Sequence, residues 1–179
     1  MLYVFGFTRL GVVLSDLYFV DPNPGPGQEG AERGVRLEVR FLDQPDRAGS
    51  VYASRPIVVD RPVWRADLLE SVDHPGSLDR AHHHPSMREW EPGRRQFDAD
   101  LSADPVDWVA ERLSDLGSLL DSAGIDRDEV DATDFDQLRQ AVPEILDAVR
   151  RLLARIGAGE LAVAPSGANA GTLVRAGWL

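Results

Sequence analysis

The spacing of apolar residues changes near Asp104, and this change limits the folds that the chain can adopt. Over residues 35–41, apolar side chains alternate with charged ones, which is the period of a strand with one face in water. After Asp104, apolar side chains recur every three or four residues, as in a helix with one face in the core. The sequence therefore predicts an α+β fold in which a sheet precedes the helices.

We expect a single domain, because 179 residues can bury a core without disulfides or metal ions. Residues 1–101 are predicted to be mainly β, as an antiparallel curved sheet or partial barrel, and residues 102–157 are predicted to be mainly α. Residues 158–179 form a tail that is flexible, adds an edge strand over residues 172–179 or docks through Trp178.

Four further segments have the composition or the alternation of strands. A break is expected between the last two of them at Pro62, because proline cannot continue a ladder of hydrogen bonds. Residues 21–34 are rich in glycine and proline and are expected to form a loop. The four expected strands cover residues 2–8, 10–20, 50–59 and 63–72.

Two helices are expected in the second half of the chain. Asp104 can cap the first of them, and its apolar stripe continues to Leu120. The second begins near Thr133 and can end at Gly157. Pro143 lies within this second stripe, so we expect it to kink the helix or to begin a new one.

Cysteine does not occur in the sequence, which excludes disulfides, thiolate zinc sites and cysteine nucleophiles. We therefore expect a cytoplasmic protein. The first twenty residues are apolar, but Arg9 and Asp16 interrupt them and no basic leader precedes them. We expect this segment to be buried strand, with no membrane association.

The negative charge of the chain is concentrated in its second half. The net charge is −11, and residues 98–147 carry 15 acidic side chains against 3 arginines. An acidic surface repels phosphate, so nucleic-acid binding is not expected, whereas a basic protein partner could bind the acidic helices. The acidic residues could also serve only to solvate the helices. All 19 basic residues are arginines, and the composition resembles that of proteins of unknown function from GC-rich bacteria, which implies no activity.

All four histidines lie within residues 74–84, and a β-hairpin is predicted around them. The sequence Asp-His-Pro-Gly at residues 73–76 is typical of a turn, and it separates the strand that ends near Val72 from a possible strand over residues 77–84. A slip of one residue would turn the histidines to the apolar face of the hairpin. If Val72 faces Ser77, the register pairs Asp67 with His82, Arg65 with His84 and Leu69 with Arg80.

In this register His82 and His84 point to the same face, as two imidazoles must in order to bind one metal ion. Asp67 could ligate the ion too, or orient His82. Arg65 and Arg80 would lie on the same face. We therefore predict a catalytic site of these five residues that acts on a small molecule, with a divalent transition metal as its candidate cofactor.

The spacing of Gly76, His82, His84 and Glu89 follows the pattern G-x5-H-x-H-x4-E and resembles the first metal motif of the cupin family. The resemblance implies a β-barrel that holds Fe, Mn, Ni or Zn, with His82, His84 and Glu89 as ligands. It covers residues 76–93 and departs from the family in two ways. Glycine follows Glu89 too early, and no histidine follows His84 to supply the second motif.

The run from Trp64 to Asp67, followed by the histidines, is similar to small bacterial toxins of the TumE type. That resemblance implies a nuclease or a nucleotide-modifying enzyme, with His82 or His84 as general acid or base and an arginine that contacts phosphate. The acidic charge of the chain opposes this function.

Two main hypotheses about function remain, an enzyme and a protein without catalysis. A metal-dependent or His-dependent enzyme requires His82, His84 and a carboxylate to converge in a concave pocket. A non-catalytic interaction protein requires exposed histidines and an exposed apolar patch, with the acidic helices or the tail as its binding surface. Trp90 lies in a polar segment and is expected to form a pocket wall, whereas Trp64 and Trp108 are expected in the core.

Overall fold

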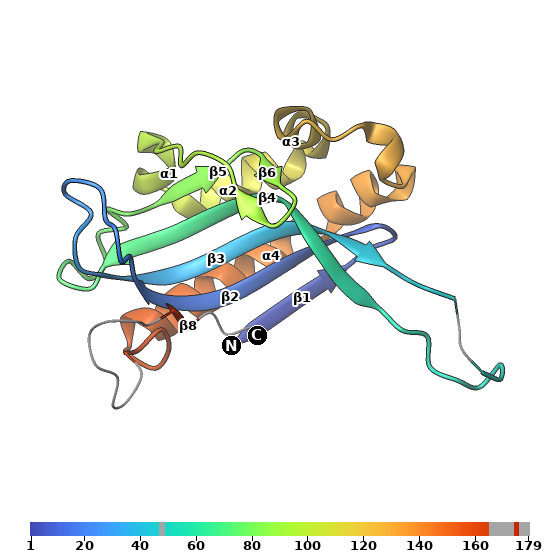
Figure 1. Cartoon of the computed structure of the whole chain (residues 1–179), viewed down its shortest axis with the longest axis horizontal. Helices are drawn as coiled ribbons and strands as arrows, with labels where there is room; N and C mark the ends of the chain where they lie inside the picture. The colour runs from blue at the N-terminus through green and yellow to red at the C-terminus, as the bar shows by residue number, and fades with distance from the viewer. Residues whose placement is uncertain (47–48, 165–173, 176–179) are drawn as a thin grey trace.

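The computed structural model of this chain describes residues 1–46, 49–164 and 174–175. Figure 1 shows a sheet that comes first along the chain and helices that follow it. The predicted α+β fold with an N-terminal antiparallel sheet and C-terminal helices is confirmed. Of the helices in the described residues, none is both long and apolar enough to cross a bilayer.

The main sheet is an open antiparallel meander, because its first five strands lie side by side in the order of the sequence. A short strand, β8, pairs with β2 opposite Tyr18 and Phe19, and β6 and β7 form a separate hairpin. Thr172 and Trp178 of the predicted tail strand lie outside the described residues. The strands are β1 (Leu2–Gly6), β2 (Leu10–Val20), β3 (Ala31–Asp43), β4 (Val58–Ser71), β5 (His82–His84), β6 (Met87–Arg88), β7 (Glu91–Pro92) and β8 (Val174–Arg175).

Pro62 lies inside β4 and does not divide it, in contrast to the predicted break. The register between β3 and β4 shifts on both sides of Arg40, which pairs with Pro62. These irregularities leave residues of β4 outside the ladder, and a bulge is a place where proline is tolerated. Residues 50–57, predicted as part of a strand, form turns and irregular backbone instead.

The helices pack on one face of the sheet. They are α1 (Ala99–Ala103), α2 (Pro105–Ser114), α3 (Leu116–Ala123) and α4 (Ala132–Gly157), with a 3-10 turn, η1 (Arg127–Glu129), before α4. The single helix predicted after Asp104 is divided at Asp115, whose side chain accepts a hydrogen bond from the Ser118 N–H and so caps α3. α4 continues through Pro143, which is exposed, so that the carbonyl its ring displaces can bond to water.

The two faces of the sheet differ in character. Alternate residues of β2, β3 and β4 form the core with the apolar stripe of α4, which lies behind the sheet in Figure 1. Trp64 and Trp108 are both buried in this core, as predicted, and their rings stack with centroids 6.0 Å apart. The other residues of the same strands form the open face, away from α4, and this face carries charged side chains such as Arg36 and Arg65 beside apolar ones such as Val13 and Leu17.

Asp134 fastens α4 to the first turn of the sheet. Its side chain is fully buried and accepts hydrogen bonds from the backbone N–H groups of Thr8, Arg9 and Leu10. It also accepts from the N–H of Asp131, the residue that caps α4. One carboxylate thus satisfies backbone donors of both a helix start and a strand turn.

Candidate functional site

The β4–β5 hairpin has the predicted register. Asp67 pairs with His82, Ala66 with His83 and Arg65 with His84. The Arg80 N–H donates to the Leu69 carbonyl at 3.1 Å, which continues the same pairing toward the turn. His82 and His84 therefore share the open face of the sheet with Asp67 and Arg65, and His83 lies on the core face.

Asp67, His82 and His84 form a compact buried group. The Oδ2 atom of Asp67 lies 3.4 Å from Nε2 of His82 and 3.6 Å from Nε2 of His84. One ligand atom from each of the three residues lies within 4.8 Å of the others. Their side chains are 1%, 2% and 3% exposed, so bulk water does not reach them. We call this group the Asp67 cluster.

Backbone carbonyls orient both imidazoles of the Asp67 cluster. Nδ1 of His82 lies 2.8 Å from the Arg80 carbonyl oxygen, and Nδ1 of His84 lies 2.7 Å from that of Gly93. A carbonyl can only accept, so each Nδ1 carries a hydrogen and donates it. Each Nε2 is consequently turned toward the carboxylate of Asp67, in the arrangement typical of metal-binding histidines.

Two arginines share the carboxylate of Asp67. The Nε atom of Arg36, on β3, lies 2.7 Å from Oδ1, and the Nε atom of Arg65 lies 3.0 Å from Oδ2. Burial by itself would raise the pKa of the Asp67 carboxyl. The charge of Arg36, the polar contacts with the rings of His82 and His84, and the charge of Arg65 hold that pKa well below its usual value. The carboxylate is therefore ionised although it is buried.

Arg65 also contacts a histidine of the Asp67 cluster. Its Nη2 atom lies 3.0 Å from Nε2 of His84. Burial lowers the pKa of Arg65, and the nearby Arg36 lowers it further, against the attraction of Asp67. Asp67 alone does not balance the charges of both Arg36 and Arg65. Arg65 therefore brings an excess of positive charge into a site that is shielded from water.

Two of the predicted site residues lie elsewhere. The guanidinium of Arg80 turns to the β2–β3 loop and donates to the Gly27 carbonyl, so only the backbone of Arg80 contacts the cluster. Glu89 is exposed in the turn between β6 and β7, with φ at 55°. The structure thus brings His82 and His84 together with Asp67, while Glu89 of the expected ligand set lies outside the group.

Sequence reasoning missed Arg36 and the carbonyl of Gly93. Arg36 lies on the wet side of the alternating pattern in β3, and it meets Asp67 because β3 and β4 are neighbours. The two strands are neighbours because the sheet is a meander. The alternating pattern of β3, combined with that topology, could therefore have identified Arg36 as a site residue. The Gly93 carbonyl reaches His84 because the segment after β7 turns back to pair Gln96 with His83, which no local pattern indicates.

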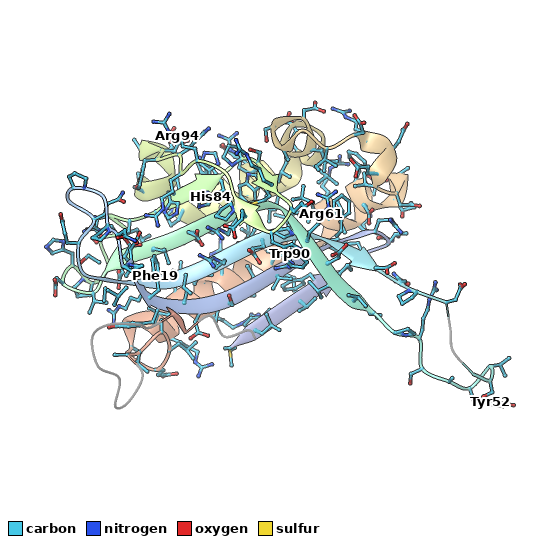
Figure 2. The ribbon with its side chains drawn as sticks, in the orientation of Figure 1. Phe19, Tyr52, Arg61, His84, Trp90 and Arg94 are labelled. Atoms are coloured by element: carbon cyan, nitrogen blue, oxygen red, sulfur yellow. The ribbon has the colours of Figure 1, made fainter. Side chains whose placement is uncertain are left out.

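A pocket of about 610 Å³ opens on the same face of the sheet, beside the Asp67 cluster. Arg36 and Arg65 line it, so they stand between the pocket and the buried histidines. Trp90 forms part of its wall, as predicted, and the guanidinium of Arg40 lies over the Trp90 ring at 5.1 Å. Figure 2 labels Trp90 and His84 on the side of the sheet toward the viewer, opposite to α4. The other lining residues are Leu2, Val4, Val13, Ser15, Leu17, Glu38, Ile57, Val58, Val59 and Pro62.

His83 lies apart from this chemistry, on the core side. Its ring packs against Trp108 with centroids 5.0 Å apart and against Trp64 at 6.3 Å. Burial, followed by the charge of Arg112, lowers the pKa of His83 to about 4. We assign His83 to the core.

Comparison with known proteins adds no relative. No family model matches the chain, and no curated protein or solved structure matches it either. The function is therefore inferred from the geometry of the Asp67 cluster and of the pocket beside it.

Proposed function

We propose that this chain is an enzyme that acts on a small molecule and that His82, His84 and Asp67 form its centre by holding a divalent transition metal ion. The observation that carries the proposal is the orientation of the two imidazoles. Both donate from Nδ1 to a backbone carbonyl, and both present Nε2 to one carboxylate oxygen. A histidine that donates from Nδ1 binds a metal ion through Nε2, and here both Nε2 atoms are turned to one negative oxygen, an arrangement that suits a shared cation.

The distances within the Asp67 cluster support a shared ion. Two donor atoms that each lie about 2.1 Å from a tetrahedral metal ion are about 3.4 Å apart. The observed separations of 3.4 and 3.6 Å from Oδ2 to the two Nε2 atoms fit this spacing, and they are long for direct hydrogen bonds. Small adjustments of the side chains would therefore complete the ligand set.

The ligand types indicate which ions fit. Two imidazole nitrogens and one carboxylate suit Zn, Fe, Co, Ni or Mn, whereas Mg and Ca prefer oxygen ligands alone. Three protein ligands leave coordination positions for water or a substrate oxygen, which the ion would polarise. Arg36 and Arg65, at the border with the pocket, would orient a bound substrate toward these positions.

The alternative within the same site is acid–base catalysis without metal. His82 would then act as the proton carrier, with Asp67 orienting its ring. The contact of Arg65 with His84 is compatible with this alternative, because a guanidinium already donates to that Nε2 atom. The two mechanisms differ in their need for metal, which makes metal content the deciding measurement.

The test is the metal content of tag-free protein, measured by mass spectrometry after exposure to Zn, Mn, Fe, Co and Ni and removal of excess ion. The variants are the double substitution His82→Ala, His84→Ala and the control His74→Ala, which removes an exposed histidine of the same hairpin. We expect about one ion per chain in the wild type and in the control, and none in the double variant. An ion that also raises the Tm of the wild type and of the control, but not that of the double variant, would locate the site in the folded state.

Either of two results would overturn the metal site. One is the absence of bound ion in wild-type protein whose circular dichroism shows it to be folded. The other is equal ion content in the double variant and the wild type. In both cases the acid–base alternative would remain as the enzyme hypothesis.

A second candidate function, protein binding, is favoured by the segment between β3 and β4. Residues 49–57 of this segment project from the sheet in Figure 1, and Tyr52 and Ile57 among them are 94% and 68% exposed. Exposed apolar side chains that gather on one projection are typical of interaction surfaces. If the segment binds a second copy of the chain, light scattering will show a mass that rises with concentration in the wild type and not in Tyr52→Asp. A constant monomer mass in both would remove self-association.

A further inference from the structure

We propose that the pocket on the open face of the sheet binds a small organic carboxylate with an apolar body, and that Arg65 together with Arg36 receives the carboxylate. This deepens the proposed function and rests on it only in that the bound acid would be the substrate of the Asp67 cluster. The binding itself needs no metal ion. It follows from the charges, the shape and the lining of the pocket.

The charges around the pocket leave one cation without its own anion. Arg40 donates to Glu38 at 2.7 Å and to the Asp60 carbonyl at 2.7 Å, so this arginine and Glu38 form a complete pair. Arg36 and Arg65 share the single carboxylate of Asp67. Among the described residues that line or underlie the pocket, three arginines therefore stand against two carboxylates. This local excess of one positive charge contrasts with the net charge of −11 of the chain.

The unbalanced cation is Arg65. Its side chain is 11% exposed, and its Nε atom, although 3.0 Å from Asp67, makes no hydrogen bond of acceptable geometry within the described part of the chain. A desolvated guanidinium with an unused donor is costly unless an anion completes its shell. The Nε atom itself is inaccessible, but the Arg65 side chain lines the pocket, so an anion in the pocket can balance the charge of the guanidinium. The planar fork of a guanidinium matches a carboxylate, which can accept two hydrogen bonds side by side.

The rest of the pocket is suited to an apolar body. Leu2 and Val4 on β1 and Val13 and Leu17 on β2 form one side of it, and Ile57 to Val59 form another. Trp90 offers a flat aromatic wall. The volume of about 610 Å³ lies in the range of pockets for small organic molecules. One unmatched positive charge favours a monoanion over inorganic phosphate, and acetate lacks an apolar body to fill the pocket, so both are expected to be poor ligands.

The experiment uses octanoate as the probe and measures its affinity for the full chain by isothermal titration calorimetry. Octanamide has the same apolar body without charge, and acetate has the charge without the body. We expect octanoate to bind with a Kd below about 1 mM. Octanamide is expected to bind more weakly, by about tenfold or more. Acetate and phosphate are expected to show no measurable binding at a concentration of about 1 mM.

Two variants with the same substitution locate the binding. Val4 is 46% exposed and lines the pocket, whereas Val163 is 48% exposed and does not line it. Val4→Glu adds a negative charge to the pocket, and we expect it to weaken octanoate binding by about tenfold or more. Val163→Glu is expected to leave the affinity unchanged. Because both positions are on the surface, both variants should fold, and circular dichroism checks this.

Specific results would overturn the assignment. The first is that the wild type does not bind octanoate, and the second is that octanoate and octanamide bind equally well. The third is that Val4→Glu and Val163→Glu change the affinity for octanoate equally. The titrations are made with chelator-treated and with metal-exposed protein. Metal binding without octanoate binding would remove the carboxylate pocket alone, and octanoate binding without any bound metal would remove the metal centre alone.

Discussion

The Nη2 atom of Arg65 lies 3.0 Å from the Nε2 atom of His84. Arginine stays protonated in proteins, so this contact is a hydrogen bond from the guanidinium to the lone pair of the imidazole. The same lone pair would bind a metal ion. Arg65 and the ion therefore compete for one nitrogen, and they also repel each other.

We predict that Arg65→Gln increases the affinity of the chain for Zn or Co by about tenfold or more, because it removes a competing cation. The affinity is measured by competition with a chromogenic chelator. The control is Arg61→Gln, since Arg61 pairs with Glu129 away from the cluster. The same variant should bind octanoate more weakly. Weaker metal binding by Arg65→Gln would contradict the competition and would favour acid–base catalysis.

Asp67→Asn is expected to destabilise the fold by about 3 kcal/mol or more, because it leaves two partly buried guanidiniums without their buried carboxylate. Denaturant unfolding at neutral pH measures the loss. Asp136→Asn is the control, since Asp136 belongs to an exposed ion pair with Arg139, and we expect it to change stability by less than about 0.5 kcal/mol. Equal stability of both variants would contradict the importance of the buried carboxylate.

Asp67 also gives the stability of the chain a dependence on acid pH. Its pKa in the folded state is held well below the ordinary value of 3.8, so the folded state resists protonation more than the unfolded state does. The stabilisation is complete above pH 3.8 and is lost as the pH falls from there toward the folded pKa. Unfolding curves between pH 6 and pH 2.5 should fall more steeply for the wild type than for Asp67→Asn. Parallel curves would contradict the low pKa.

Glu32 is expected to act in the opposite direction. Its side chain is buried, its Oε2 atom has no hydrogen-bond partner in the described residues, and burial raises its pKa above 4.5. Its stabilising contribution is thus present below pH 4.5 and is lost as the pH rises through the folded pKa. We predict that Glu32→Gln stabilises the protein at pH 7 by about 1 kcal/mol and that the gain disappears in acid. The exposed Glu111→Gln is the control, and a loss of stability at pH 7 in Glu32→Gln would refute the assignment.

Gly34→Ala should destabilise the sheet by about 3 kcal/mol or prevent folding, because a Cβ atom there would lie 2.0 Å from the carbonyl oxygen of Leu68. The neighbour is backbone of β4 and cannot move alone. Gly157→Ala is the matched control at the end of α4, where a Cβ meets nothing within 4 Å. Thermal unfolding compares the two variants, and similar Tm values would contradict the close approach of β3 and β4.

The parts of the site that follow from strand period could be predicted from the sequence. Alternation in β3 and β4, together with a turn at residues 73–76, was sufficient to predict that His82 faces Asp67. Glu89 was expected as a ligand because the resemblance to the cupin metal motif implies it. Spacing along the chain does not show that Glu89 sits in a two-residue turn with a positive φ, which points it into solvent.

Other features could not be predicted because they depend on contacts between distant segments. The division of the first helix at Asp115 is a competition between a side-chain cap and one more helical turn, and the apolar stripe continues across it. The continuity of β4 through Pro62 depends on bulges that its partner β3 permits. The excess charge on Arg65 appears only when β3 places Arg36 on the same carboxylate.

The hydrogen bonds between the first turn of the sheet and Asp134 also bear on how the chain is made. Thr8 and Asp134 are 126 positions apart, whereas each of the first five strands pairs with its neighbour in sequence. During synthesis, the strands can pair in the order in which they leave the ribosome, since each partner has just been made. The donors of the first turn find their buried acceptor only after residue 134 has emerged. In a nascent chain that ends earlier, the strands of the meander can already be paired. The backbone donors of the first turn then lack their acceptor until the start of α4 has been made.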